Sequence, residues 1–217
     1  MSEMDIIIKT IALTMGVAWA SGINLYAAIL VLGLLGSTGN VVLPPELQIL
    51  THPAIIGAAG LMYAVEFFAD KIPGIDNTWD TIHTFIRIPA GAILAAGAVG
   101  PVNPALTVAV AILGGGLAAG SHATKAGSRI LINASPEAGT NRLISVTEDA
   151  VVVAGLWTAF YYPWLFLFLL FAFLGFMIWL LPKIWKGIKK VFGFLGSLLG
   201  RKEAAVEEPE KGPDEAR

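Results

Sequence analysis

The chain contains no cysteine, only three histidines and few charged residues. The absence of cysteine excludes disulfide bonds, thiolate metal sites and cysteine nucleophiles. Asp, Glu, Lys and Arg together make up 14% of the 217 residues, roughly half of their share in soluble domains. The net charge is −2 and no broad basic surface is expected, which argues against nucleic acid as a partner.

Apolar residues, in contrast, are abundant. Hydrophobic residues make up 56% of the chain and the mean hydropathy is +0.73. The apolar residues are grouped in runs long enough to cross a membrane. These runs predict an all-α integral membrane protein with about six membrane segments. The expected segments are approximately residues 5–36, 53–71, 76–100, 103–136, 143–161 and 163–181.

The first and fourth segments contain small and polar residues that interrupt the apolar pattern. The interruptions are Ser21–Asn24 in the first segment, and Gly114–Gly116 and Gly120–His122 in the fourth. We expect both segments to be broken or re-entrant. Broken helices at matching positions of two halves indicate a transporter-type site, so residues 5–100 and 103–182 are predicted to be an inverted 3+3 repeat.

The membrane domain is expected to cover residues 1–182. Residues 183–202 predict a basic amphipathic helix that lies along the membrane surface. Residues 203–217 are polar and contain proline, which predicts a disordered tail.

The lysine and arginine residues predict the orientation of the chain. With six crossings, Lys71, Arg129 and Arg142 fall on the same side as the basic C-terminal stretch. Cytoplasmic loops carry an excess of these residues. We therefore expect both termini in the cytoplasm.

Acidic residues lie within or beside the apolar segments, where an ionised group costs about 2.5–3.5 kcal/mol at the bilayer centre. Glu66 and Asp70 are four residues apart on one helix face, and such a carboxylate pair can carry a proton or a cation. The alternative is that Asp70 reaches the headgroups and Glu66 pairs with a base. Glu148 is a third candidate, whereas Asp149 is interpreted as an acid favoured by the helix dipole.

A second group of candidates lies in the third segment. Asp80, His83 and Arg87 follow one another at helical spacing, which suits a proton relay or a salt-bridged gate. The alternative is an interfacial helix with solvated charges. One Asp-x-x-His pair is weak evidence for a metal site, so neither a metal nor another cofactor is expected.

The fourth segment carries a basic stripe made of His122, Lys125 and Arg129. Such a stripe suits an anionic group, which would be a lipid phosphate, a carboxylate or an inorganic anion. These bases could instead neutralise acids on neighbouring helices. Asn24, at the break in the first segment, is expected to line the site, because non-helical backbone at membrane depth lies in protein or lines a wet cavity.

Several sequence motifs resemble those of a known family. They are ASGIN, VEFFADKIPGID, TWDTIHTFIR, SHATKAGSR, NASPE and SVTEDAVVV. They are similar to motifs of small bacterial multi-span membrane proteins catalogued as a domain of unknown function. The resemblance covers roughly residues 12–182 and implies a multi-pass protein of the bacterial inner membrane. It implies no activity.

These patterns favour a small secondary transporter or channel-like carrier that is coupled to protons or cations. Its substrate would be a small anion or a lipid phosphate. The alternative is a lipid-binding or membrane-assembly protein that transports nothing. An enzyme is not expected. The expected partners are membrane lipids and a small ion or anionic substrate, and the spacing of Gly116 and Gly120 would support a homodimer.

Overall fold

The computed structural model describes residues 2–72, 74–133 and 138–206, and within these ranges every regular element is helical. The elements are α1 (Glu3–Ser37), the 3-10 helix η1 (Pro45–Thr51), α2 (Pro53–Ala69), α3 (Ile75–Ala98), α4 (Pro104–Asn133), α5 (Ala138–Tyr161) and α6 (Pro163–Val206). Five helices are long and apolar enough to cross a membrane, and η1 with α2, bent by 69°, is a sixth candidate. The expected all-α membrane fold is confirmed.

Helix α1 is broken at Asn24, where the sequence predicted an interruption. The backbone of Asn24 is extended, with φ −146° and ψ 98°. Its side-chain Oδ1 accepts a hydrogen bond of 2.9 Å from the N–H of Ala27, so Asn24 is the N-cap of the second half of α1. The carbonyl of Ile23 accepts a hydrogen bond of 3.0 Å from Nζ of Lys125. Two side chains therefore satisfy backbone groups that the break leaves unpaired.

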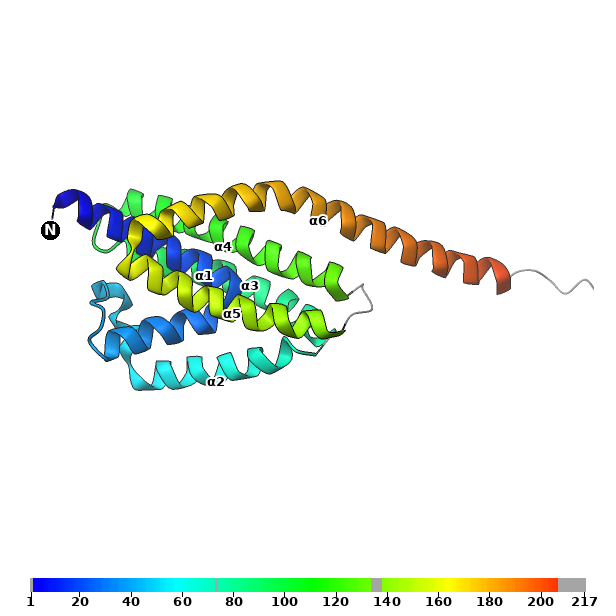
Figure 1. Ribbon diagram of the computed structural model, residues 1–217, viewed down its shortest axis with the longest axis horizontal. Helices are drawn as coiled ribbons and strands as arrows, with labels where there is room; N and C mark the ends of the chain where they lie inside the picture. The colour runs from blue at the N-terminus through cyan, green and yellow to red at the C-terminus, as the bar shows by residue number, and fades with distance from the viewer. Residues whose placement is uncertain (1, 73, 134–137, 207–217) are drawn as a thin grey trace, which may run out of the picture.

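The break reverses the chain, so that α1 is a re-entrant hairpin (Figure 1). An unbroken helix of 35 residues would be about 52 Å long. Instead Thr10, before the break, lines the same cavity as Asn40 and Val41, which follow α1. The first half of α1 therefore starts, and the second half finishes, at the same end of the bundle, here called the N-terminal end. Asn24 is the tip of the hairpin. The turn between α2 and α3 lies at the opposite end, here called the far end.

The expectation of two cytoplasmic termini stays a prediction, which the arrangement of the described ends does not favour. The N-terminus lies at the N-terminal end, whereas α6 leaves the bundle at the far end (Figure 1). The expectation counted α1 as a full crossing because its hydropathy is that of a long span. A hairpin that returns to the end where it began adds no net crossing, and the other candidate spans among the described residues are α2 to α6.

The fourth segment is not broken, contrary to the prediction. Every residue of α4 from Pro104 to Asn133 is helical. Its glycines serve close packing instead, since a Cβ at Gly114 would lie 2.3 Å from the Cβ of Ala95 on α3.

Helix α6 continues through Pro182 as far as Val206, so the predicted end at Pro182 is wrong. Proline removes one hydrogen bond and can bend a helix without ending it. Residues 183–202 are therefore an extension of α6. Their position on the membrane surface stays a prediction, and residues 207–217 of the predicted tail lie outside the described residues.

The inverted repeat stays a prediction. Helix α2 runs opposite to α5, and α3 runs opposite to α6 (Figure 1), as such a repeat requires. Any up-and-down bundle would show the same directions, and α4 has no break that matches Asn24.

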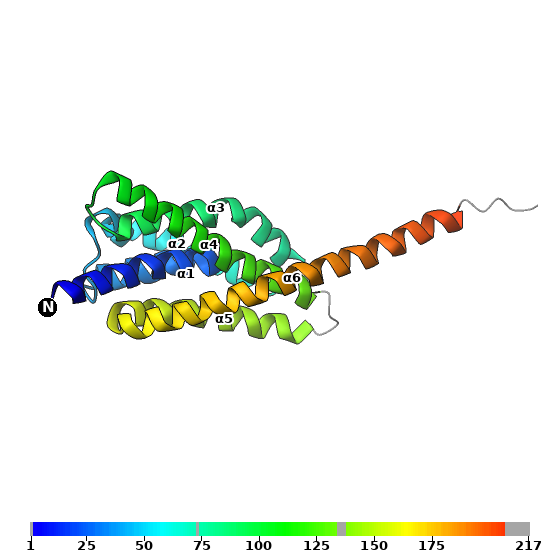
Figure 2. The ribbon, with the colours of Figure 1, turned by 90° about the horizontal axis from the view of Figure 1, so that it is seen from above.

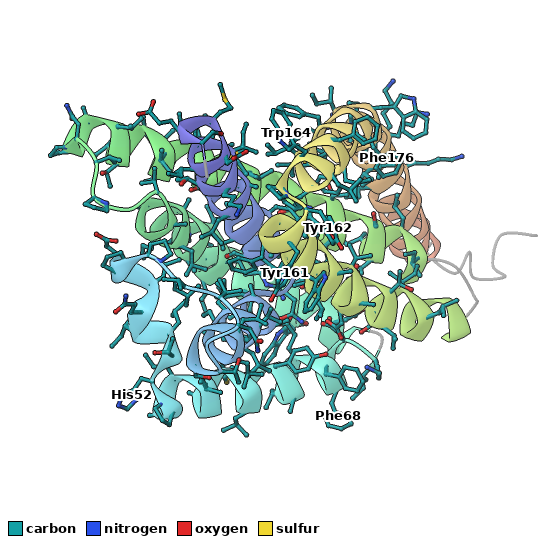
Figure 3. All side chains as sticks on the ribbon, turned by 60° about the vertical axis from the view of Figure 1, so that its left-hand side comes forward. His52, Phe68, Tyr161, Tyr162, Trp164 and Phe176 are labelled. Atoms are coloured by element: carbon teal, nitrogen blue, oxygen red, sulfur yellow. The ribbon has the colours of Figure 1, made fainter. Side chains whose placement is uncertain are left out.

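The α1 hairpin is the core of the bundle, and the other helices surround it (Figure 2). In the most apolar window of α1, 72% of the residues are buried, against 11% in α6. Small residues allow this enclosure, because a Cβ at Gly22 would lie 1.9 Å from Oγ of Ser121 and 2.3 Å from the carbonyl of Ala118. Large aromatic residues such as Phe68 and Trp164 point outward instead (Figure 3), with 65% and 64% of their surface exposed.

Candidate functional site

Charged side chains from four helices meet inside the bundle beside the tip of α1. Seven of them form a continuous set of ion pairs, here called the ion cluster. Its members are Glu66 and Asp70 of α2, Asp80 and Arg87 of α3, Lys125 and Arg129 of α4, and Glu148 of α5. Six members are at most 4% exposed, and the side chain of Glu148 is 17% exposed.

Arg87 joins α2 to the first turns of α3. Its Nη2 lies 2.6 Å from Oε1 of Glu66, and its Nη1 lies 2.9 Å from Oδ1 of Asp80. Asp80 and Arg87 are two helical turns apart, so their side chains extend from the same face of α3. The guanidinium group therefore holds two carboxylates through charge-assisted hydrogen bonds.

Lys125 and Arg129 are one turn apart on α4 and connect three other helices. Nζ of Lys125 lies 3.2 Å from Oε1 of Glu66 and 3.1 Å from Oδ2 of Asp70, and it also caps the tip of α1. Nη2 of Arg129 lies 2.9 Å from Oδ2 of Asp70 and also donates to Oε2 of Glu148. Arg129 is thus a direct bridge between α2 and α5.

His122 is a neutral member of the same network. Arginine can only donate, so Nη1 of Arg87 donates to Nδ1 of His122 across 3.1 Å. The ring proton is then on Nε2, which donates to Oγ1 of Thr84 across 2.7 Å. Oγ1 of Thr84 in turn donates to the carbonyl of Asp80 across 3.0 Å. This chain of hydrogen bonds includes Thr84, which the sequence analysis did not select, and its use as a proton relay stays a prediction.

His83 lies beside the ion cluster and has different partners. Its Nδ1 donates to the carbonyl of Trp79 across 2.9 Å, and its ring stacks on that of Trp79 at 4.3 Å. Nε2 of His83 is hydrogen-bonded to the hydroxyl of Tyr26 on α1 across 3.1 Å. Tyr26 was also not selected from the sequence, because a lone tyrosine in an apolar run gives no signal of its partner.

In the described part of the chain, the side chain of Asn24 is hydrogen-bonded to Asp149 and to none of the seven members of the ion cluster. Its Nδ2 donates to Oδ1 of Asp149 across 2.9 Å. Asp149 is 8% exposed and is the main residue that the sequence analysis missed. It was interpreted as an acid at a helix start, but α5 begins at Ala138, three turns earlier. Its position deep in an apolar helix would have been the signal.

Among the described residues, the ion cluster contains four carboxylates and three bases. Asp70 also makes an interaction beyond these pairs. In a low-dielectric interior such pairs are strong, and an uncompensated charge is costly. Binding of a proton or a cation by these carboxylates stays a prediction.

Two other expectations concern metals and association. No group of three or more metal-ligating side chains is arranged around a common point in the described part of the chain. Gly120 is covered by Met177 of α6, since a Cβ there would lie 2.7 Å from its sulfur, whereas nothing lies within 4 Å of a Cβ at Gly116. The predicted dimer motif therefore has one of its two glycines engaged within the chain.

Comparison with known proteins gives one match. A family model described as a domain of unknown function, DUF4126, matches residues 11–183. No curated protein and no solved structure matches the chain. The matched range contains all of α2 to α5, the tip of α1 and every member of the ion cluster. The chain therefore belongs to the DUF4126 family.

Proposed function

We propose that this protein is a small proton-coupled secondary carrier of the bacterial cytoplasmic membrane, with a small anion as its substrate. The observation that carries the proposal is the buried bridge of Arg129 between Asp70 of α2 and Glu148 of α5. Both bases of α4 are occupied by carboxylates from other helices. An anion can therefore reach them only by replacing a carboxylate.

Protonation of a carboxylate allows an anion to take its place beside a base. When a carboxylate of the ion cluster takes up a proton, its attraction for Lys125 or Arg129 falls, and the base becomes available to an anion. Binding of the anion and of the proton are then linked, as coupled transport requires. Glu148 is the natural entry point, because it is the most exposed carboxylate of the ion cluster and contacts Arg129 directly.

The orientation in the membrane follows from the lysines. Lys71 follows α2 at the far end, and Lys183, Lys186, Lys189 and Lys190 follow on the α6 extension at the same end. The positive-inside rule assigns this end to the cytoplasm. The ion cluster then lies in the cytoplasmic half, and the N-terminus is on the opposite side.

A second candidate is a lipid-binding protein that transports nothing. It is favoured by a cavity of about 510 Å³ between the α1 tip and α4, α5 and α6. Lys125 and Glu148 line its polar part, and Phe173, Phe176 and Leu180 line its apolar part. This combination suits one chain and the headgroup of a lipid.

Proton flux distinguishes the two candidates. The full chain is reconstituted into liposomes with a pH-sensitive dye inside, and a proton gradient is imposed with and without inorganic phosphate. The carrier proposal predicts dye responses for the wild type and for Glu46→Gln, a control on exposed η1, and none for Glu66→Gln. A dye response of the wild type that Glu66→Gln reproduces in full would reject the carrier mechanism. A silent wild type that retains lipid through purification, detected by mass spectrometry, would favour lipid binding.

A further inference from the structure

A second cavity lies on the other face of α5, between α2 and α5. Its volume is about 610 Å³, which is in the range of small-molecule sites. Three aromatic side chains line it, Tyr63 and Phe67 from α2 and Trp157 from α5. The single acidic residue in its lining is Asp149, and the remaining lining residues are valine and alanine.

Asp149 presents a buried carboxylate to this cavity without a base in contact. Oδ1 accepts the hydrogen bond from Asn24, whereas Oδ2 is buried and has no partner of normal hydrogen-bond geometry among the described residues, although the hydroxyl of Tyr63 lies near the carboxylate. No ion pair within 4 Å involves Asp149 in the described part of the chain, and the neighbouring Glu148 takes the contacts with Arg129 and Lys125. A buried carboxylate of this kind gains most from a positively charged partner.

The aromatic walls suit the same kind of partner. A cation over the face of Trp, Tyr or Phe is attracted by the ring quadrupole. Phe67 already holds one, since Nζ of Lys71 lies 2.8 Å from its ring centroid. Burial lowers the pKa of Lys71, and the negative charges of Asp149 and Asp70 counteract this effect. Lys71 is thus an internal cation that contacts Phe67, one of the lining residues.

The chemistry of the lining favours an organic cation over calcium or magnesium. Calcium and magnesium ions require six or more oxygen ligands, or several retained waters, and one carboxylate with one phenol does not supply them. A substituted ammonium needs only one opposite charge and apolar or aromatic contact. The cavity provides both.

We propose that the cavity between α2 and α5 binds a lipophilic organic cation, with Asp149 as its counter-ion and Trp157, Tyr63 and Phe67 as its cation–π walls. The proposal goes beyond the proposed carrier function and does not depend on it. It assigns to Asp149 a role separate from that of Glu148, although the two residues are adjacent in the sequence. Trp157 is half exposed, so it borders the lateral opening of the cavity.

Binding of tetrabutylammonium to the purified full chain in detergent tests the proposal. Titration calorimetry and tryptophan fluorescence measure affinity, and protein-free micelles correct for partition of the probe. Asp149→Asn keeps the size of the side chain and its oxygen acceptor for Asn24 but removes the charge, and we expect at least about tenfold weaker binding. Trp157→Leu should weaken binding about 2- to 30-fold, the range given by one cation–π contact. Glu46→Gln, on exposed η1, removes one charge elsewhere and should leave the affinity unchanged.

Lys71→Ala keeps the test decisive even where Asp149→Asn fails to fold. Loss of the internal cation should tighten binding of tetrabutylammonium, whereas Trp157→Leu should weaken it. Misfolding would not shift the affinity in opposite directions at these two positions, neither of which is fully buried. Absence of binding to the wild type at about 1 mM, or unchanged affinity in folded Asp149→Asn, would overturn the proposal. Because the assay involves no flux, it gives the same answer whether or not the ion cluster moves protons.

Discussion

Arg87 offers the sharpest test of the ion cluster, because its charge can be removed with little change in volume. Arg87→Met replaces the guanidinium with an unbranched apolar chain and leaves Glu66 and Asp80 without the contacts of 2.6 Å and 2.9 Å. Arg87 and Glu66 are both fully buried, so water does not replace the lost partner. Removal of one member of a buried pair costs about 3–5 kcal/mol.

This cost becomes a shift in the midpoint of thermal unfolding. For a chain of 150–250 residues, each kcal/mol lowers the midpoint by about 2–4 °C, so Arg87→Met should lower it by about 6–20 °C. Glu66→Gln should lower it by less than about 3 °C, because the amide keeps an oxygen acceptor for Arg87 and the substitution removes the surplus negative charge. The double variant has three carboxylates and two bases, so it returns to the wild-type excess of one carboxylate and should recover part of the loss.

Intrinsic tryptophan fluorescence and size-exclusion chromatography after heating both measure the midpoint in detergent. Arg87→Met within about 2 °C of the wild type would show that water reaches the ion cluster, which contradicts the described burial. If Arg87→Met and Glu66→Gln lower the unfolding midpoint equally, the balance of charge in the ion cluster does not determine stability.

Three further predictions concern the α1 hairpin. In the cysteine-free chain, single cysteines that replace Ser2 and Thr38 should react with an impermeant maleimide from one side of the membrane. A cysteine that replaces Lys186 should react from the other side. Labelling of all three positions from one side would exclude the re-entrant topology. Gly22→Ala should lower the unfolding midpoint by at least about 4 °C, because its Cβ would meet Ser121 and Ala118 at 1.9 Å and 2.3 Å, and an unchanged midpoint would contradict that packing. Asn24→Ala should cost about 2–4 kcal/mol in unfolding assays, since it leaves a buried N–H and a carboxylate oxygen without partners, whereas Asn24→Ser, which keeps a capping oxygen, should cost less.

The local spacing of charges made most of the ion cluster predictable. Glu66 and Asp70, and likewise Lys125 and Arg129, are four residues apart, so each pair had to share a helix face. The sequence could not show that Lys125 and Arg129 meet these acids, because pairing between helices depends on their rotation and tilt. The observed contacts are those of mutual neutralisation, since each of the two bases lies against carboxylates of other helices.

Hydropathy could not show whether α1 crosses the membrane or turns back as a hairpin. An apolar hairpin and an apolar crossing bury similar side chains, and only the N-cap at Asn24 distinguishes them. The glycines of α4 resembled a break but serve close approach to α3, as Gly114 illustrates. Asp149 was assigned to a helix start because the predicted start of this segment, at Leu143, was five residues later than the observed start at Ala138.

The polar tip of α1 also constrains the order in which the molecule can assemble during synthesis. The ribosome produces α1 before α4 and α5, which carry Lys125 and Asp149. Without these partners, the free carbonyl of Ile23 and the amide of Asn24 would face lipid, where unpaired polar groups are strongly disfavoured. The first helix to be made is therefore expected to be the last to reach its final place, and it would wait near the membrane surface until α4 and α5 have inserted. A chain arrested after α3 should leave a cysteine at Asn24 accessible to aqueous reagents, and completion of α5 should protect it.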